Sequence, residues 1–522
     1  MPLIAALTPI LAPLLLLAVF QMRASRALPL CFAATALVTS LVWKVPPRRM
    51  AAAVAEGGIL AASILWIVFG ALILYNVLRV SGAMEVMRHR LAAASPDRRA
   101  HVLLIAWLFG AFLESVAGFG TPLAVCAPLL VALGFPPAGA IVLCLLANSA
   151  PVTFGAAGTP LLIGMLQGLG PAGSLPLLRE AGVIAAGFNV VIGSFIPFLM
   201  VAMFTRFFAS GDAGYAPGWR SGLAYWRPAL LAGFGFTLSA WLAAVYLSPE
   251  FPSLAGALGG FAGVAFAFRR GWIAHGVAPS PLGGLSLRRA VAPYALLVLL
   301  LAFSRLLPPV REGLQAGTLV FRDLLGTDLT ASFPLLYSPG TLFLLVALPA
   351  FRLYRLQARD AGEIFVASLR KLVPSAITLL FALPMVRLFI HSGENGLGLA
   401  AMPLELARVA AGMTGELWPL AAPFVGALGA FVSGSATFSN LMFSLLQYDA
   451  AVATGVPVAV VLGLQAFGAA AGNMMSVLNV VAAAAVVGLS GREGAALRLT
   501  LLPTLIVCLA AGVAGTLLVC LL

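Results

Sequence analysis

One apolar run of this chain, residues 102–135, contains a carboxylate followed by a stretch of glycines and a proline. Its centre reads Gly110-Ala-Phe-Leu-Glu-Ser-Val-Ala-Gly-Phe-Gly-Thr-Pro122, so the acid, Glu114, directly precedes residues that do not continue a regular helix. At membrane depth such backbone is tolerated only where protein or a water-filled cavity receives its polar groups. An acid at this place marks a candidate functional site.

Composition places this run in a membrane protein rather than in a soluble domain. Hydrophobic residues make up 62% of the 522 positions and charged residues only 9%, whereas an ordinary soluble domain carries about 25% charged residues. Apolar runs of about 20 residues, the length that crosses a bilayer, recur along the whole chain. We therefore expect an all-α polytopic membrane protein with about 12 transmembrane helices and two broken or re-entrant hairpins.

The expected spans follow from these runs. They cover residues 3–20, 28–43, 58–78, the broken segment 102–135, the interrupted span 139–168, then 182–205, 229–247, 252–268, 290–307, 339–350, 372–390, the broken segment 418–447, the interrupted span 456–489, and 499–521. The first is interpreted as a retained span, because no basic start or small-residue cleavage site marks it as a signal peptide. Residues 308–338 form a polar loop with room for a short surface helix.

The first broken segment is repeated 319 residues later, as Gly429-Ala-Phe-Val-Ser-Gly-Ser-Ala-Thr-Phe-Ser-Asn-Leu441. Residues 140–147 match residues 459–466 at the same offset. Two matches at one offset indicate an internal duplication. The expected organisation is an N-terminal helix pair (1–57), a first repeat (58–209), connecting transmembrane helices (210–371) and a second repeat (372–522).

The distribution of positive charge orients the chain. Six loops on one face, 21–27, 79–101, 206–228, 269–289, 351–371 and 489–498, hold 21 of the 30 Lys and Arg residues. The positive-inside rule makes these loops cytoplasmic, although Lys44, Arg48 and Arg49 then lie on the opposite side. The loop before the first broken segment is basic and cytoplasmic, and the loop before the second is external, so the repeats are expected to be inverted, as in many secondary transporters.

In an inverted repeat the four breaks meet near the midplane, and the N-termini of the half-helices point their positive dipole ends at an anion. Glycines there allow close approach of a ligand to the backbone, and Ser, Thr and Asn supply neutral hydrogen bonds. The candidate substrate-binding residues at the breaks are Gly118, Phe119, Gly120, Thr121, Asn148, Ser149, Thr153, Gly155, Thr159, Ser433, Ser435, Thr437, Ser439, Asn440, Asn473 and Ser476. The alternative is that these small residues form close-packed helix interfaces.

Glu114 and Arg387 are the two charged residues well within the expected spans. Loss of water disfavours an ionised lone carboxyl, so Glu114 is the candidate for proton coupling; the alternative is a protonated acid in a structural hydrogen bond. Arg387 either binds a substrate carboxylate with two hydrogen bonds or extends to the nearby membrane interface.

Four motifs resemble the lactate permease family, which includes glycolate permeases. They are Phe109-Gly-Ala-Phe-Leu-Glu114, Ala117-Gly-Phe-Gly-Thr-Pro122, Ala147-Asn-Ser-Ala-Pro-Val-Thr-Phe-Gly155 and Gly434-Ser-Ala-Thr-Phe-Ser-Asn440. The resemblance implies import of a small 2-hydroxy monocarboxylate, such as lactate or glycolate, together with protons. It also implies a multi-pass protein of the bacterial inner membrane.

The second half departs from the pattern of that family. Ala436 stands where the family usually has an aspartate, and Asn473 where it tends to have a lysine. Loss of one partner alone would strand a buried charge, so the joint absence of acid and base suggests that one ion pair was lost as a unit.

Other functions remain as alternatives. The chain could carry another small organic anion, couple to sodium instead of protons, or act as a non-transporting sensor or partner subunit. An intramembrane enzyme is disfavoured, because the sequence has no nucleophile–base pair and no metal-ligand spacing. ATP-driven pumping is disfavoured, because the sequence has no phosphate-binding Gly-x-x-x-x-Gly-Lys loop. No cofactor, metal or nucleic-acid partner is expected. A homodimer is left open beside a monomer.

Overall fold

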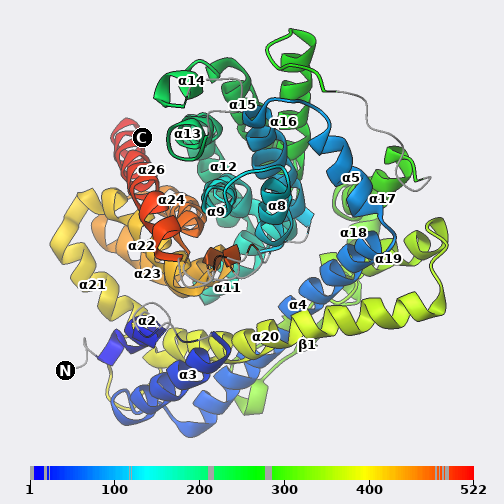
Figure 1. The fold of residues 1–522 in the computed structure, drawn as a ribbon. Coiled ribbons are helices and arrows are strands. Elements are labelled where there is room, and N and C mark those ends of the chain that lie inside the picture. Colours follow the sequence, from blue (N-terminus) through cyan, green and yellow to red (C-terminus); the bar gives the residue numbers. More distant parts are fainter. Residues whose placement is uncertain are drawn as a thin grey trace. The chain divides into compact units, whose positions relative to one another are not determined.

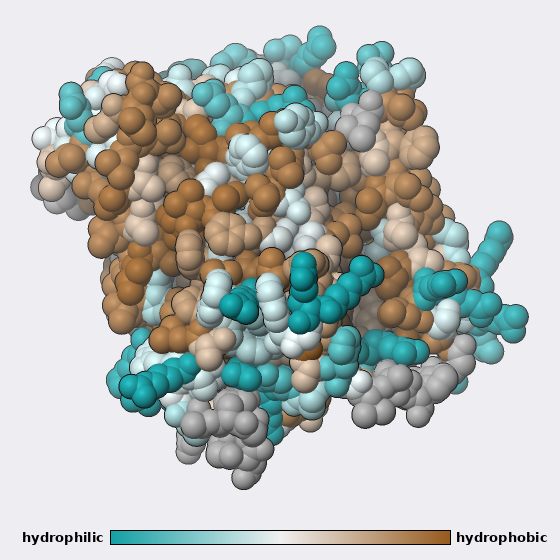
Figure 2. Space-filling view, turned by 90° about the horizontal axis from the view of Figure 1, so that it is seen from above, coloured by the Kyte–Doolittle hydropathy of each residue, from teal (hydrophilic) through white to brown (hydrophobic). Residues whose placement is uncertain are grey.

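The computed structural model describes residues 24–116, 118, 120–209, 217–276, 285–476 and 493–522, together with short pieces within 5–22 and 479–489. Helices make up most of these residues (Figure 1). In this described part, nine helices are long and apolar enough to cross a membrane, and four shorter apolar helices accompany them. Figure 2 shows hydrophobic side chains over much of one face, with hydrophilic ones gathered along its edges. The protein is an all-α polytopic membrane protein, as predicted.

The chain divides into two compact units. Unit 1 consists of residues 1–89 and 280–406, and unit 2 of residues 90–279 and 407–522. Each unit therefore takes one piece from each half of the sequence.

Unit 1 is built on two helices that are longer than a single crossing requires. Its main helices are α3 (Ala24–Leu41), α4 (Pro47–Val80), α17 (Leu287–Leu306), α19 (Pro339–Leu353) and α20 (Ala358–Ile390), with the short α2 (Thr8–Pro13). α4 packs against α20 and α19, and α20 also packs against α3. A Cβ added at Gly57 would lie 2.5 Å from the Pro384 nitrogen, and one at Gly340 would lie 2.5 Å from the Trp66 carbonyl oxygen. Glycine at these crossings lets the backbones touch.

The two long helices begin earlier than predicted, at Pro47 and Ala358 instead of residues 58 and 372. Proline suits the first turn of a helix, and Gln357 with Asp360 forms a capping box before α20. Two of the basic residues before position 58 have partners within unit 1: Arg49 pairs with Asp328 and Glu394. Arg48 donates to the Leu325 carbonyl at 2.5 Å. These contacts give a physical reason for cations on the face predicted to be external.

The connections of the described chain add elements that the hydropathy pattern does not show. The polar loop 308–338 contains the expected surface helix, α18 (Pro308–Ala316), and also a two-stranded antiparallel sheet of β1 (Leu319–Phe321) and β2 (Ala331–Phe333). The expected loop at 391–416 contains α21 (Met402–Thr414). Of the predicted first span, 3–20, the structure describes residues 5–13, 15, 16 and 20, which include the short helix α2.

Unit 2 contains all four breaks. Its elements are α6 (Arg98–His101), η2 (Val102–Phe109), α7 (Gly110–Val116), α8 (Thr121–Ala132), α9 (Pro137–Ala147), η3 (Ala150–Phe154), α10 (Gly155–Thr159), η4 (Pro160–Met165), α11 (Leu166–Leu169), α12 (Leu175–Val191), α13 (Ile196–Met203), α15 (Trp226–Tyr246), α16 (Pro252–Arg269), α22 (Trp418–Ser433), α23 (Ala436–Thr454), α24 (Val458–Gly472), η12 (Asn473–Met475) and α26 (Glu493–Leu521). α8 packs back against η2 and α7, so the first broken segment is a hairpin. α23 likewise packs against α22.

Candidate functional site

The first break is a sharp reversal at the end of α7. Glu114 lies in the last turns of this helix, which ends at Val116. Gly118 and Gly120 then take positive φ angles of 55° and 76°, a conformation that glycine adopts without steric cost. Thr121 begins α8, with a proline at its second position. The sequence Gly-Phe-Gly-Thr-Pro therefore ends one helix and starts another directly beside the acid.

The second break, between α9 and η4, holds backbone in an unusual conformation. Ala156, Ala157 and Gly158 have φ values of 43°, 53° and 78°, which is left-handed backbone. Each non-glycine residue in that conformation costs roughly 1–2 kcal/mol. Such strain persists where surrounding structure determines it, and it gathers at functional sites. Here a Cβ added at Gly118 would lie 2.7 Å from the Ala156 methyl, so the first two breaks are in close contact.

The two breaks of the second half are shaped by glycine and by capping side chains. α22 ends at Gly434, whose φ is 73°. Ser435 then caps α23 by accepting the Phe438 N–H at 3.3 Å. α24 ends at Gly472, and Asn473 opens the short turn η12.

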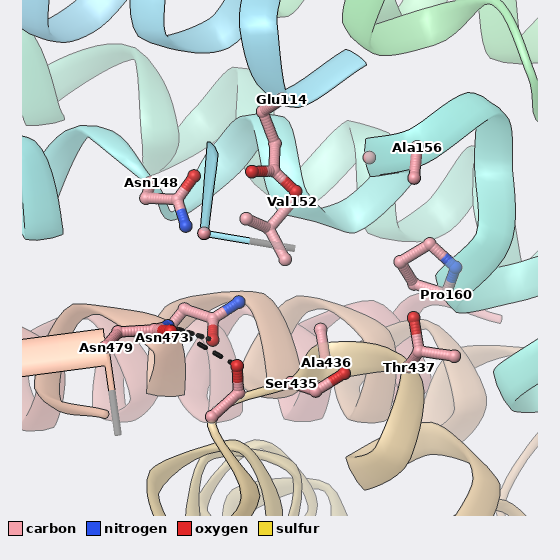
Figure 3. A pocket seen from close by; sticks show the side chains of 13 residues that line it. Glu114, Asn148, Val152, Ala156, Pro160, Ser435, Ala436, Thr437, Asn473 and Asn479 are labelled. Carbon is pink, nitrogen blue, oxygen red and sulfur yellow. Dashed lines mark hydrogen bonds between the residues drawn. The ribbon is translucent and has the colours of Figure 1, made fainter. Parts of the chain in front are cut away.

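The four breaks surround one cavity of about 50 Å³. Its lining comes from all of them: Glu114, Gly120, Asn148, Val152, Gly155, Ala156, Pro160, Gly434, Ser435, Ala436, Thr437, Asn473 and Asn479. Figure 3 shows the labelled residues of the first half facing those of the second across the cavity. A single water needs roughly 10–15 Å³, so the space suits a few waters or a small solute.

Three helical segments begin at this cavity. α8 starts after Gly120, η4 starts at Pro160, and α23 starts after Ser435, and all three of these residues line the cavity. The N-terminus of a helix carries a partial positive charge and free N–H groups, which together favour an anion. Helix starts of this kind are typical of sites that bind an anion.

Glu114 and Asn148 bring hydrogen-bonding capacity that the described residues leave unused. Each is only 5% exposed, and neither Glu114 Oε2 nor Asn148 Oδ1 has a hydrogen-bond partner in the described part of the chain. A Cβ added at Gly155 would lie 2.5 Å from Glu114 Oε1, so glycine makes room for the carboxyl group. Buried polar atoms without partners are rare, and two in one cavity indicate a place for a ligand or ordered water.

The structure separates the sequence candidates into two groups. Seven of them line the cavity: Glu114, Gly120, Asn148, Gly155, Ser435, Thr437 and Asn473. Gly118 does not line it but lies next to Ala156, which does. Phe119 lies outside the described residues. The other predicted residues are not among those that line the cavity; they are Thr121, Ser149, Thr153, Thr159, Ser433, Ser439, Asn440 and Ser476.

Three of these residues donate hydrogen bonds to the surrounding backbone. Ser149 donates to the Leu146 carbonyl at 2.7 Å, and Ser439 donates to the Gly426 carbonyl at 2.6 Å. Asn440 donates its Nδ2 to the Pro160 carbonyl at 3.0 Å and so joins the two halves of unit 2. The contacts of these three residues fit the alternative that such small polar side chains form helix interfaces.

Two features of the cavity extend the sequence prediction. Asn479 lines it and donates its Nδ2 to Gly434 O and Asn473 Oδ1, both at 3.4 Å. Its polar side chain in an apolar run was the signal that could have identified it. Ala436 and Asn473, the two departures from the pattern of the family that the sequence resembles, both line this cavity.

Arg387 has a partner that the sequence did not suggest. It lies in α20 of unit 1, is 2% exposed, and its Nε is 3.5 Å from Glu56 Oε1. The second oxygen of Glu56 is 2.8 Å from His391 Nε2. Glu56 was placed before the span at 58–78, but α4 includes it, so Glu114 is not the only acid buried in a long apolar helix. Arg387 is not among the residues that line the cavity.

Relatives of this chain are found along its whole length. The model of a family described as L-lactate permease matches residues 2–522. A putative L-lactate permease of Haemophilus influenzae is 31% identical over 470 residues, which cover 84% of each chain. The L-lactate permease of Bacillus subtilis and the glycolate permease of Escherichia coli are each 28% identical, over 95% and 96% of this chain and 92% and 93% of their own.

The contact between Gly155 and Glu114 gives a first prediction. Gly155→Ala adds a methyl group where Glu114 Oε1 now lies, so the carboxyl must move into the cavity. We expect binding of a small carboxylate to fall at least about tenfold, with a loss of stability of about 1–3 kcal/mol. Ligand-induced thermal stabilisation of the purified protein measures both. Gly110→Ala is the matched control, because the nearest atom to its added Cβ is 3.7 Å away. Equal binding by the two variants contradicts the assignment.

The Glu56–Arg387 pair gives a second prediction. Removing one partner of a buried ion pair strands the other charge and costs about 3–5 kcal/mol. We expect Glu56→Gln and Arg387→Gln each to lower the melting temperature, and the double variant to recover most of the loss. If the losses simply add, the two side chains do not act as a pair. If Arg387→Gln abolishes ligand binding at unchanged stability, Arg387 contacts the ligand instead.

Proposed function

Because the chain belongs to the L-lactate permease family, we propose that it is a secondary transporter that imports a small 2-hydroxy monocarboxylate together with protons. Its relatives include an L-lactate permease and a glycolate permease. The proposed location is the bacterial inner membrane. The observation that carries the proposal is the cavity at the four breaks, where three helix N-termini meet one buried carboxyl group.

The helix N-termini account for recognition of the carboxylate. The starts of α8 and α23 offer backbone N–H groups and partial positive charge to a single anionic group, and the start of η4, whose Pro160 has no N–H, adds partial positive charge. The neutral side chains of Asn148, Ser435, Thr437 and Asn473 offer donors and acceptors for a hydroxyl group next to it. The small cavity volume favours a substrate of a few heavy atoms.

Glu114 accounts for the coupling to protons. An ionised carboxylate without a partner is costly to bury, so in the closed cavity Glu114 is proposed to carry its proton. A protonated carboxyl donates a hydrogen bond to a substrate carboxylate, whereas an ionised one repels it. Substrate and proton therefore bind together, and exposure of the cavity to water on the other side releases both.

This mechanism predicts a separation of two activities in Glu114→Gln. The amide keeps a donor for the substrate but cannot release a proton. We expect uptake driven by an imposed pH gradient, acidic outside, to fall at least about tenfold, while exchange of substrate across the membrane continues. Proteoliposomes loaded with labelled lactate or glycolate measure both activities.

Glu180→Gln is the matched control, because Glu180 is an exposed carboxylate of α12. It should leave both activities unchanged. If Glu114→Gln still concentrates substrate in response to the pH gradient, the proton is carried elsewhere. An imposed sodium gradient that drives the wild-type protein would instead assign the coupling to sodium.

The proposed alternating access rests on two inverted repeats, residues 58–209 and 372–522. The boundaries between the units support this organisation, because they fall at 89/90 and 406/407, close to equivalent positions at the 319-residue offset. Cavity-lining residues also come from corresponding breaks of both repeats.

The inverted repeat predicts opposite sidedness for a matched pair of positions. Arg90 and Val409 are 319 residues apart, and both are exposed. In a background with the exposed Cys520 replaced by serine, Val409→Cys should react with an impermeant maleimide from outside and Arg90→Cys only from the cytoplasmic side. Reaction of both cysteines from one side excludes the inverted arrangement.

A further inference from the structure

Unit 1 contains a groove that the transport site does not use. It has a volume of about 590 Å³ and lies between the last turn of α4 and the first half of α20, lined by Arg79, Gly362, Glu363, Val366, Ala367, Arg370 and Lys371. Small-molecule sites commonly have volumes of about 300–1,000 Å³. The groove is therefore large enough for the polar part of a substantial ligand.

The groove carries an excess of positive charge. Three cations, Arg79, Arg370 and Lys371, share it with one carboxylate, Glu363. The contact between Arg79 and Glu363 is long, at 3.9 Å, and both side chains are largely exposed, so it neutralises little. In the described chain neither Arg370 nor Lys371 forms an ion pair with a carboxylate. The groove thus has unused capacity for an anion.

An aromatic ring holds one of these cations at the groove. The Lys371 ammonium lies 5.0 Å from the centre of the Tyr75 ring on α4. Tyrosine and lysine are typical of the zone where a membrane helix meets the headgroups. Arg79 and Lys371 also belong to the two loops, 79–101 and 351–371, that the positive-inside rule places on the cytoplasmic side.

An apolar stripe continues from the groove along α20. Val366 lines the groove, and Val373 and Leu380 follow at intervals of seven residues, which places all three on one face of the helix. Their side chains are 47%, 54% and 45% exposed. From Val366 to Leu380 the stripe runs for about 21 Å at 1.5 Å per residue. That length covers about one leaflet of the hydrocarbon core, roughly 15 Å.

We propose that this groove binds the phosphate headgroup of an anionic phospholipid from the cytoplasmic leaflet, with an acyl chain lying along Val366, Val373 and Leu380. The cations at the head and the apolar stripe below it match the two parts of such a lipid. Basic pockets between transmembrane helices on the cytoplasmic side are a known form of lipid recognition. A free phosphate or an acidic peptide would use the cations but would leave the stripe without a role.

The experiment compares lipids on the purified full-length protein in detergent. Phosphatidylglycerol, phosphatidylcholine and inorganic phosphate are added separately, and lipid retention is measured by native mass spectrometry together with the melting temperature. We expect the wild-type protein to retain phosphatidylglycerol and to be stabilised by it, and to respond little to the other two.

The triple variant Arg79→Gln, Arg370→Gln, Lys371→Gln should bind phosphatidylglycerol roughly tenfold to hundredfold more weakly. The matched control removes three exposed arginines of the same predicted face, as Arg352→Gln, Arg355→Gln and Arg359→Gln. It should keep wild-type retention. Glu363→Gln removes the only acid among the described residues that line the groove, and should strengthen retention severalfold even if the triple variant does not fold.

Three outcomes overturn the proposal. Equal loss in the control variant means that retention reports net charge rather than this groove. Unchanged retention in both the triple variant and Glu363→Gln places the lipid elsewhere. Stabilisation by inorganic phosphate that equals that of phosphatidylglycerol means that the groove binds a free anion. None of these outcomes depends on transport, so the lipid site and the transport proposal are tested separately.

Discussion

One constraint shapes the region of unit 2 around the cavity. Backbone that leaves a helix inside a bilayer must form its hydrogen bonds within the protein. Much of this hydrogen bonding is between the breaks themselves. Asn440 of the second half binds the Pro160 carbonyl of the first, and Asn479 binds the Gly434 carbonyl across the second half. Ser253 of α16 supplies a third such bond, to the Pro151 carbonyl at 2.5 Å. These hydrogen bonds hold the breaks together, and the cavity lies where Glu114 Oε2 and Asn148 Oδ1 have no partner in the described chain.

The two buried acids, Glu56 and Glu114, have the same side chain but different surroundings. Glu56 has both oxygens engaged, one near Arg387 and one at His391. Its charge is thus compensated where it stands, and it holds α4 to α20. Glu114 has no such partner in the described chain and faces open space instead. A buried carboxyl group without a protein partner can form hydrogen bonds with a ligand or water that binds in the cavity and later leaves it.

The breaks could be predicted from the sequence because their causes are local. Glycine in left-handed backbone ends a helix and proline suits the first turn of one: Gly118, Gly120 and Gly434 all have positive φ, and Pro122 is the second residue of α8. The repeat then indicated that breaks far apart in sequence belong together. Ala156 and Ala157 could not be predicted in the same way, because their left-handed backbone depends on close contacts of neighbouring segments.

Long-range pairings set the limit of the sequence prediction. Glu56 and His391 are 335 residues apart, and the basic residues near Arg49 made the start of α4 look like a loop. The contacts of Arg49 with Asp328 and Glu394 show how its charge is compensated within that helix. Among the site candidates, the sequence pointed to the right segments. It could not tell which polar side chains face the cavity and which bind backbone, because that depends on the rotation of each segment.

The lengths of α4 and α20 have a consequence for the membrane around the protein. Helices of 34 and 33 residues are about 50 Å long, whereas the hydrocarbon core is about 30 Å thick. Such helices cross only at a tilt or with ends that project, and the tilt changes whenever the local thickness changes. Since Gly57 and Gly340 bring neighbouring backbones into contact with α4, a tilt of α4 is passed directly to α19 and α20. A change in bilayer thickness therefore changes the tilt of these packed helices of unit 1 together.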